Sequence, residues 1–311
     1  MSLSDDLSAD FSQTVGLIPY FPQPARIRLR AQDQGNAQGN ALGLTSFGVR
    51  FDLSSNQVEL LRDALLRLPL ECKRSFSASI SPQYSLIHRE QSSKTPKPSY
   101  RLYRSGRLVF ACADRAEFLH RFGSVISLYV AEASRKRTFV HAGVVGWGDR
   151  AVLIPGRSFS GKTTLVAELV RAGATYYSDE FAVIDKQGMV YPYARPLQVR
   201  ENGSSHQTER PVEHFGGIAG QEPLPVGLVI VSRYKPEAHW RPRQISAGVG
   251  LLKILDNTVS ARRAPAVAMS TLKQVVSNAL IVRGVRGDAS QVVDWIAAHF
   301  GSPAAFPGMT Q

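Results

Sequence analysis

Residues 156–163 read GRSFSGKT and match the spacing G-x-x-x-x-G-K-[ST] at every fixed position. The glycines of such a loop let backbone N–H groups turn toward a polyphosphate, and a helix that follows adds a partial positive charge. Lys162 has the reach for β- and γ-phosphates, and the Thr163 hydroxyl is suited to hold Mg²⁺. The residues predicted to surround the phosphates are Gly156, Arg157, Ser158, Phe159, Ser160, Gly161, Lys162, Thr163 and Thr164.

The segments beside this loop decide between a phosphate site and a chance match in a Gly/Ser-rich turn. The apolar run 151–154 predicts a buried strand. After the loop, an apolar stripe at helical spacing predicts a helix that ends at Gly173. Strand, glycine loop and helix in this order are the context that a phosphate-binding loop requires. We therefore expect the chain to bind a nucleoside triphosphate.

Two adjacent acids, Asp179 and Glu180, follow the predicted helix at the end of a strand-like run. Phosphoryl transfer needs a divalent metal and a group that orients or deprotonates the attacking hydroxyl. One carboxylate could bind Mg²⁺ while the other accepts the substrate proton. Successive side chains on a strand point opposite ways, so only a strand end or a bulge would let both serve one site. The alternative is an acid pair that solvates a loop.

His141 lies in the apolar run 139–147, which precedes the loop's strand. A histidine in such a run is either a satisfied structural residue or a partner of the acids. A hydrogen bond from His141 to Asp179 would tune the orientation and the pKa of that acid. The residue types leave the two interpretations even.

The composition is that of an ordinary globular chain, with 43% hydrophobic and 20% charged residues in 311. Cys72 and Cys112 lie far apart without metal-ligand spacing, which favours a reducing compartment over a disulfide framework or a zinc site. The first 13 residues do not resemble a signal peptide, and no apolar run approaches membrane-spanning length. We expect a cytoplasmic protein with no membrane partner.

The net charge of +12 and a pI near 10.0 raise the question of nucleic acid. The basic residues are scattered as singles and short clusters, without a long run or an RNA-binding signature. We interpret them as a solvated surface that partly serves an anionic nucleotide, rather than as a nucleic-acid interface.

The chain divides into two predicted domains at residues 137 and 138. The first, 1–137, combines strands, a hairpin turning at 105–106, and two helices with capping boxes at Ser54 and Gln57 and at Asp114 and Glu117. The second, 138–311, carries the loop, a later buried strand at 227–232, helices at 249–255, 266–277 and 290–300, and a strand at 280–285. Residues 202–225 show no period and predict a flexible loop near the site.

The second domain resembles the C-terminal domain of HPr kinase/phosphorylase and of HPr-kinase-related proteins. The matching segments are 141–143, 156–163, 171–173, 178–180 and 192–197. That core is similar in fold to nucleotide-binding phosphoenolpyruvate carboxykinases. The resemblance implies an α/β class (α+β overall), with a P-loop core on a mixed sheet preceded by a small α+β domain. It covers about half of the chain.

By position, the resemblance implies that Asp179 is the catalytic base and His141 its partner. Lys162 and Thr163 would serve ATP and Mg²⁺, and Glu180 would be a metal-side carboxylate beside Asp179. The family has two aspartates where this chain has an Asp-Glu pair, which leaves open which of the two acids binds the metal.

Arg195 is a candidate nucleotide or phosphate contact by the same resemblance, with Arg262 and Arg263 as weaker candidates. The family usually has glycine at the place of Phe159. The chain also lacks a counterpart of the downstream glycine/arginine signature tied to HPr binding and phosphorolysis, which argues against phosphorylase activity.

The sequence thus predicts an ATP-dependent kinase that phosphorylates a hydroxyl on a protein, a peptide or a small molecule. Residues 202–225 and the first domain are where we expect acceptor specificity. The alternatives are a non-catalytic regulatory ATP-binding module and a carboxykinase-like enzyme. A ring or a dimer of identical chains is what the resemblance suggests.

Overall fold

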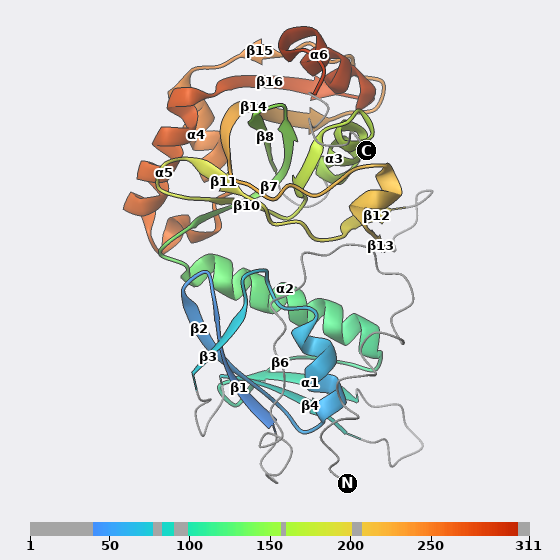
Figure 1. Cartoon of the computed structure of the whole chain (residues 1–311), viewed down its shortest axis with the longest axis vertical. Helices are drawn as coiled ribbons and strands as arrows, with labels where there is room; N and C mark the ends of the chain where they lie inside the picture. The colour runs from blue at the N-terminus through green and yellow to red at the C-terminus, as the bar shows by residue number, and fades with distance from the viewer. Residues whose placement is uncertain (1–39, 77–82, 90–98, 157–159, 201–206, 304–311) are drawn as a thin grey trace, which may run out of the picture.

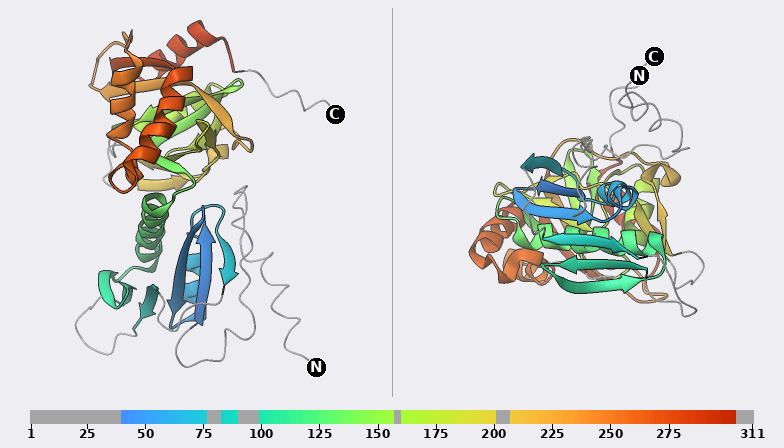
Figure 2. Two further views of the ribbon diagram at one scale, coloured as in Figure 1. Left: turned by 90° about the vertical axis from the view of Figure 1, so that its left-hand side faces the viewer. Right: turned by 90° about the horizontal axis from the view of Figure 1, so that it is seen from below.

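The computed structural model describes residues 40–76, 83–89, 99–156, 160–200 and 207–303. They form a mixed α/β structure in two lobes, a first lobe of residues 40–137 and a second lobe of residues 138–303 (Figures 1 and 2). Each lobe is built on its own large sheet, and a small two-stranded sheet belongs to the second.

The first sheet has six strands in the order β3-β1-β2-β4-β5-β6. Their bounds are β1 Asn40–Ser46, β2 Val49–Ser55, β3 Lys73–Phe76, β4 Tyr84–His88, β5 Tyr100–Arg104 and β6 Arg107–Cys112. The hairpin predicted at Ser105 and Gly106 is confirmed, with φ of +47° and +76°. Phe47 and Gly48 make the same kind of turn, at +47° and +79°, between β1 and β2. Positive φ at both positions suits the right-handed twist of paired strands.

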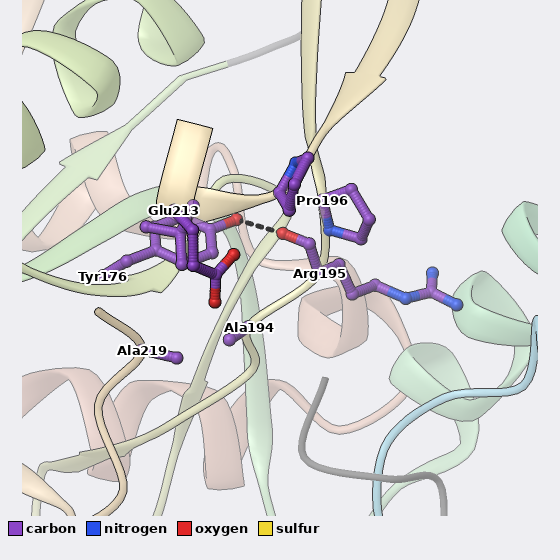
Figure 3. Close-up of a pocket in the computed structure, with 8 residues that line it drawn as sticks. Tyr176, Ala194, Arg195, Pro196, Glu213 and Ala219 are labelled. Carbon is purple, nitrogen blue, oxygen red and sulfur yellow. Dashed lines mark hydrogen bonds between the residues drawn. The ribbon is translucent and has the colours of Figure 1, made fainter. Parts of the chain in front are cut away.

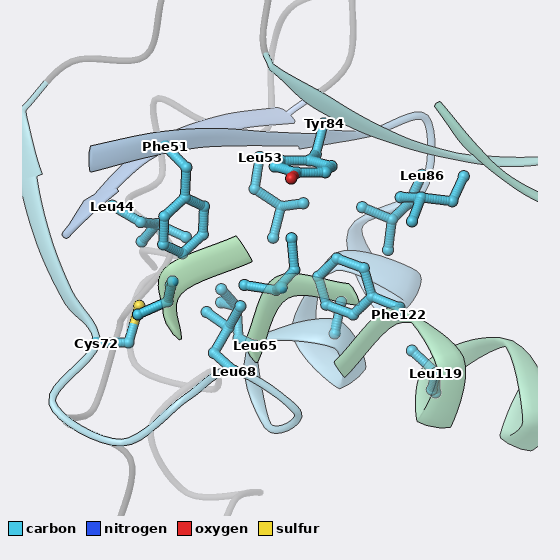
Figure 4. Close-up of a cluster of buried hydrophobic side chains, with 14 of the residues drawn as sticks. Leu44, Phe51, Leu53, Leu65, Leu68, Cys72, Tyr84, Leu86, Leu119 and Phe122 are labelled. Carbon is cyan, nitrogen blue, oxygen red and sulfur yellow. The ribbon is translucent and has the colours of Figure 1, made fainter. Parts of the chain in front are cut away.

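Helices α1 (Val58–Leu65) and α2 (Arg115–Ala133) pack on one face of this sheet, over the apolar cluster in Figure 4. The cap predicted for α2 is confirmed, because the Asp114 carboxylate accepts a 2.7 Å hydrogen bond from the Glu117 N–H. The cap predicted at Ser54 and Gln57 is wrong. Ser54 lies in β2, where its hydroxyl donates to the Ser85 hydroxyl, and Gln57 is an N-cap without a side-chain bond.

The second sheet has eight strands, in the order β11-β10-β7-β8-β14-β16-β15 with β9 paired to β7. Their bounds are β7 Thr138–Trp147, β8 Arg150–Pro155, β9 Thr175–Ser178, β10 Phe181–Ile184, β11 Met189–Tyr191, β14 Leu224–Tyr234, β15 Arg243–Gln244 and β16 Leu280–Arg286. Strands β8, β14 and β16 run parallel, and β7 and β10 are antiparallel to their neighbours. The carboxyl ends of β8, β14 and β16 therefore share one edge.

Helices cover both faces of the second sheet, as the alternation along β8 requires. Val152 and Ile154 face α3 (Lys162–Arg171) and α6 (Ser290–Phe300). Ala151 and Leu153 face α4 (Ala247–Leu255) and α5 (Pro265–Asn278). These four helices and β16 lie where the sequence pattern predicts them.

The expectation of a period-free loop over 202–225 is wrong for residues 207–215 and 224–225. They hold β13 (Gln207–Arg210), the 3-10 helix η2 (Val212–Phe215) and the start of β14. Strand β13 pairs with β12 (Leu197–Arg200), and Val212 and Phe215 join the apolar cluster under α3. Tertiary packing thus orders a segment that has no local period. Residues 202–206 lie outside the described residues.

The apolar cluster of the first lobe continues into the second lobe. Phe139, Phe181 and Tyr193 belong to it, and the rings of Phe47 and Phe139 meet edge to face at 5.3 Å. The segment after β11, residues 192–196, lies at the same boundary. Tyr193 packs in the cluster, and Arg195 donates to the Arg67 carbonyl of the first lobe. In the described part of the chain, no helix is long and apolar enough to cross a membrane.

Candidate functional site

Strand β8 and helix α3 meet at the edge where the parallel strands end. Strand β8 ends at Pro155 and α3 begins at Lys162, with Gly161 as its N-cap. Gly161 has a φ of +78°, a left-handed conformation that favours glycine. The first N–H groups of a helix have no acceptor within it, so the start of α3 offers donors and a partial positive charge at this edge.

The side chain of Lys162 is enclosed at the start of α3, with 7% of the residue exposed. Burial lowers its pKa, and the nearby Asp179 carboxylate acts in the opposite direction. Gly156 and Ser160, on either side of residues 157–159, lie close together, because a Cβ on Gly156 would lie 2.7 Å from Ser160 Oγ. The predicted Gly156, Gly161 and Lys162 thus lie together at the carboxyl end of β8 and the start of α3.

Asp179 lies beside the first turn of α3, where the Thr163 hydroxyl donates to its Oδ2 at 2.7 Å. The residue is half-buried, but Oδ1 is closed off from solvent and has no hydrogen-bond partner among the described residues. Burial raises the pKa of Asp179 to about 6, against the lowering effects of the Thr163 bond and of Lys162. The acid is therefore poised near neutral pH.

The two acids occupy an interruption between β9 and β10, which pair with successive parts of the same strand, β7. The Ser178 hydroxyl accepts hydrogen bonds from the N–H groups of Glu180 and Phe181, and so holds the bend. The interruption frees the acids from strict alternation, but it sends them to different partners. Asp179 meets Thr163 and Glu180 meets Arg195, at 3.2 Å.

Arg195 contacts the first lobe, and the expectation that it serves the nucleotide does not fit its contacts. Its guanidinium donates to the Ser127 hydroxyl at 2.9 Å and to the Arg67 carbonyl at 2.7 Å, besides Glu180. These acceptors belong to α2, to the segment after α1 and to the acid pair. In this structure Arg195 ties the two lobes together, and Glu180 is its ion-pair partner.

A gap of about 10 Å³ lies beside the backbone of Arg195 (Figure 3). The Tyr176 hydroxyl donates to the Arg195 carbonyl at 2.7 Å along its wall. A space of this size holds about one water molecule. It is a packing gap and not a ligand site.

His141, on β7, faces the loop instead of the acid. Its Nδ1 lies 2.8 Å from the Gly156 carbonyl oxygen, which only accepts, so the proton is assigned to Nδ1 and Nε2 is left as an acceptor. Burial and the charge of Lys162 lower the pKa of His141, which keeps the ring neutral at pH 7. The predicted bond from His141 to Asp179 is wrong in this structure.

His141 also borders an open cleft of about 430 Å³. The remaining lining comes from both lobes: Glu132, Asp256, Asn257, Thr258, Val259 and Arg262. Arg263, next to this lining, makes a 3.1 Å ion pair with Glu132. The two weaker arginine candidates, Arg262 and Arg263, therefore lie at the cleft and its border.

Arg286, the last residue of β16, is a site residue that the sequence interpretation missed. Its Nη2 donates to the Gly161 carbonyl at 2.6 Å, and only 1% of the residue is exposed. The available signal was an arginine at the carboxyl end of a predicted strand, just before Gly287. The parallel order of β8, β14 and β16, which brings that end to the loop, is not readable from local sequence.

The structure thus brings Lys162, Thr163 and Asp179 together, with His141 one contact away through Gly156. Thr164 is exposed on the first turn of α3. The predicted Arg157, Ser158 and Phe159 lie outside the described residues.

Mg²⁺ at a nucleotide site is held by one or two protein oxygens together with phosphates, so it needs no cage of acids. The residues that the structure describes contain no group of three metal-ligating side chains. The Thr163 hydroxyl and the unpartnered Oδ1 of Asp179 supply the oxygens that such a site requires.

No protein-family model matches the sequence, and no curated protein matches it. Among solved structures, the chain is similar to the HPr(Ser) kinase/phosphatase from Coxiella burnetii, with 14% sequence identity and a TM-score of 0.27. That match covers 52% of this chain and 89% of the other. Function is therefore inferred below from the residues of the site alone.

Proposed function

We propose that this chain is an ATP-dependent phosphotransferase of the HPr-kinase-like type, which moves the γ-phosphate of ATP to a hydroxyl acceptor. The observation that carries the proposal is the 2.7 Å hydrogen bond between Thr163 and Asp179. It joins the end of a glycine loop to a half-buried acid whose pKa is raised to about 6. A phosphate cradle, a metal-side hydroxyl and an acid are the parts that phosphoryl transfer uses.

In this proposal the start of α3 binds the phosphates. The backbone N–H groups of its first turn donate to phosphate oxygens, and the Lys162 ammonium contacts the β- and γ-phosphates. The Thr163 hydroxyl would hold Mg²⁺, which would neutralise phosphate charge when bound, and Asp179 lies beside it. Glu180 stays with Arg195 and supports Asp179 from outside the site.

Asp179 orients the acceptor hydroxyl and takes its proton. As the O–H proton passes to the carboxylate, the acceptor oxygen attacks the γ-phosphorus and the bond to the β–γ bridging oxygen breaks, releasing ADP. A pKa of about 6 makes this carboxylate a better base than an ordinary aspartate while it remains ionised at pH 7. His141 holds the Gly156 end of the loop through Nδ1.

The acceptor enters through the cleft at His141. The cleft of about 430 Å³ is open and borders the loop through the His141–Gly156 contact. Both lobes line it, since Glu132 comes from α2 and Asp256 from the end of α4. Its size admits a side-chain hydroxyl of a peptide or protein, or a small molecule.

A regulatory ATP-binding module is a second candidate, favoured by the contact of Glu180 with Arg195. Through Arg195, the acid pair is tied to Ser127 and Arg67 of the first lobe. Such a tie could transmit nucleotide binding between the lobes without any transfer of phosphate.

The substitution Asp179→Asn tests the proposal. The protein is incubated with γ-labelled ATP, Mg²⁺ and cell extract separated into protein and metabolite fractions, and MgATP affinity is measured by calorimetry. We expect the wild type to label an acceptor, and Asp179→Asn to lose labelling by at least 100-fold while it still binds ATP. Asp149→Asn, an exposed acid in the turn before β8, is the matched control. ATP binding without labelling in the wild type would support the regulatory module, and no binding would overturn both.

A further inference from the structure

We infer that Arg286, the buried last residue of β16, binds the phosphate chain of the nucleotide and balances part of its negative charge. The inference rests on the proposed function and names a residue that none of the motifs contains. Its basis is an arginine that is buried and touches the N-cap of α3, while no acid in the described chain pairs with it.

The geometry sets Arg286 against the loop. Its Nη2 lies 2.6 Å from the Gly161 carbonyl and 3.5 Å from that of Ser160. A Cβ built on Gly161 would lie 2.5 Å from this same Nη2. The left-handed φ of Gly161 favours glycine, and the missing side chain leaves room for the guanidinium at the N-terminus of α3.

The electrostatics leave this arginine unbalanced. Only 1% of Arg286 is exposed, its Nε is buried without a partner in the described residues, and burial lowers its pKa. Its other contact is the ring of Tyr234, at 5.8 Å. The neighbouring acid Asp288 instead accepts a 3.0 Å hydrogen bond from the N–H of Ser290. Among the described residues, no carboxylate makes an ion pair with Arg286.

A buried guanidinium without a carboxylate is costly, because desolvation disfavours the charge and carbonyl dipoles offset it only in part. A bound anion is what would balance it. The Nε donor holds no acceptor in the described chain, and a planar guanidinium suits the oxygens of a phosphate. Position selects the anion: Gly161 precedes Lys162, so the charge of Arg286 lies beside the predicted phosphate cradle.

The alternative is that Arg286 is only a latch, which holds the loop through the two carbonyls. The two roles predict different stabilities for the ligand-free protein. Loss of a latch lowers the melting temperature, whereas loss of an unbalanced buried charge leaves it unchanged or raises it.

The test compares Arg286→Met and Arg286→Lys with Arg283→Met, an exposed arginine on the same strand. Calorimetry measures the binding of MgATP, magnesium tripolyphosphate and adenosine to the full chain, and ligand-free melting is recorded for each variant. We expect Arg286→Met to bind both phosphate ligands at least tenfold more weakly, with an unchanged or higher melting temperature. Arg286→Lys, which keeps the charge but loses the planar fork, should lose at least threefold, and Arg283→Met less than twofold.

Three results would overturn the inference. One is wild-type affinity for tripolyphosphate in Arg286→Met. Another is a lower melting temperature with phosphate affinity retained, which identifies the latch. If Arg286→Met does not fold, wild-type phosphate affinity in Arg286→Lys decides against it. If the wild type itself does not bind MgATP, the proposed function is overturned. That result differs from wild-type affinity in Arg286→Met, which overturns only the inference about Arg286.

Discussion

Thr163 donates its hydroxyl proton to the carboxylate of Asp179 across 2.7 Å, which joins the first turn of α3 to the bend between β9 and β10. The bond fixes the distance between a metal-side hydroxyl and the proposed base. Thr163→Ala would therefore remove the metal ligand proposed above and release Asp179 from this hydrogen bond. We expect it to weaken Mg²⁺-dependent ATP binding at least tenfold, while Thr163→Ser, which keeps the hydroxyl, stays within threefold. Calorimetry with and without Mg²⁺ checks this. Equal affinity of the Ala and Ser variants would remove the hydroxyl from the site.

The acidity of Asp179 sets a pH dependence for phosphate transfer. Burial raises its pKa to about 6, and only the deprotonated form accepts the acceptor's proton. We expect kcat/KM for the acceptor to rise about tenfold per pH unit below pH 6 and to level off above it. Initial rates from pH 5 to 8 measure the inflection. A profile that is flat through pH 6 would exclude Asp179 as the base.

The same shift makes Asp179 a stability defect of the ligand-free protein. Its folded pKa of about 6 exceeds the ordinary value of 3.8, so the folded state holds this proton more tightly than the unfolded chain does. The destabilisation is absent below pH 3.8, grows as pH rises to 6 and is constant above it.

Asp179→Asn, which cannot ionise, should therefore be more stable than the wild type at pH 8. The gain is at most about 3 kcal/mol, the equivalent of this shift, and it should vanish toward pH 4. Urea unfolding at both pH values measures it, with Asp149→Asn as the exposed control. A gain that is the same at pH 4 and pH 8 would mean that charge burial is not its cause.

Arg195 should matter for stability and not for ATP. Arg195→Met leaves the carbonyl of Arg67 and the carboxylate of Glu180 without their donor, in surroundings where the arginine side chain is only 22% exposed. Lost bonds of this kind cost about 2–4 kcal/mol of unfolding free energy. We expect a lower melting temperature and MgATP affinity within threefold of the wild type at 15 °C. Unchanged melting with a tenfold loss of affinity would return Arg195 to the nucleotide.

Local patterns predicted the elements of the second lobe well. The apolar stripe of α3, the buried run of β8 and the cap of α2 are set by neighbours within a few residues, which a sequence displays directly. The strand and the 3-10 helix within residues 207–215 were missed for the opposite reason. Their order comes from β12 and from the surface under α3, which lie elsewhere in the chain or in the fold.

For the candidate site, too, the sequence predicted only what local patterns carry. Lys162 and Thr163 follow from a motif, and Asp179 from its place after the helix. The hydrogen-bond and ion-pair partners of the site residues could not be predicted in this way. His141 contacts the Gly156 carbonyl, Glu180 pairs with Arg195, and Arg286 contacts Gly161 from a strand more than 100 residues later. Pairings of this kind depend on strand order and on which side chain fills the nearest gap.

The edge-to-face contact of Phe47 with Phe139 has a consequence for how the polypeptide can be divided. Phe139, Phe181 and Tyr193 close the hydrophobic cluster of the first lobe from the other side of residue 137. A fragment that begins at residue 138 would expose these aromatic side chains to solvent, and the fragment that ends at residue 137 would expose the apolar cluster that they cover. We therefore expect the two lobes to unfold as one cooperative unit, so the protein is best expressed and studied as the intact chain.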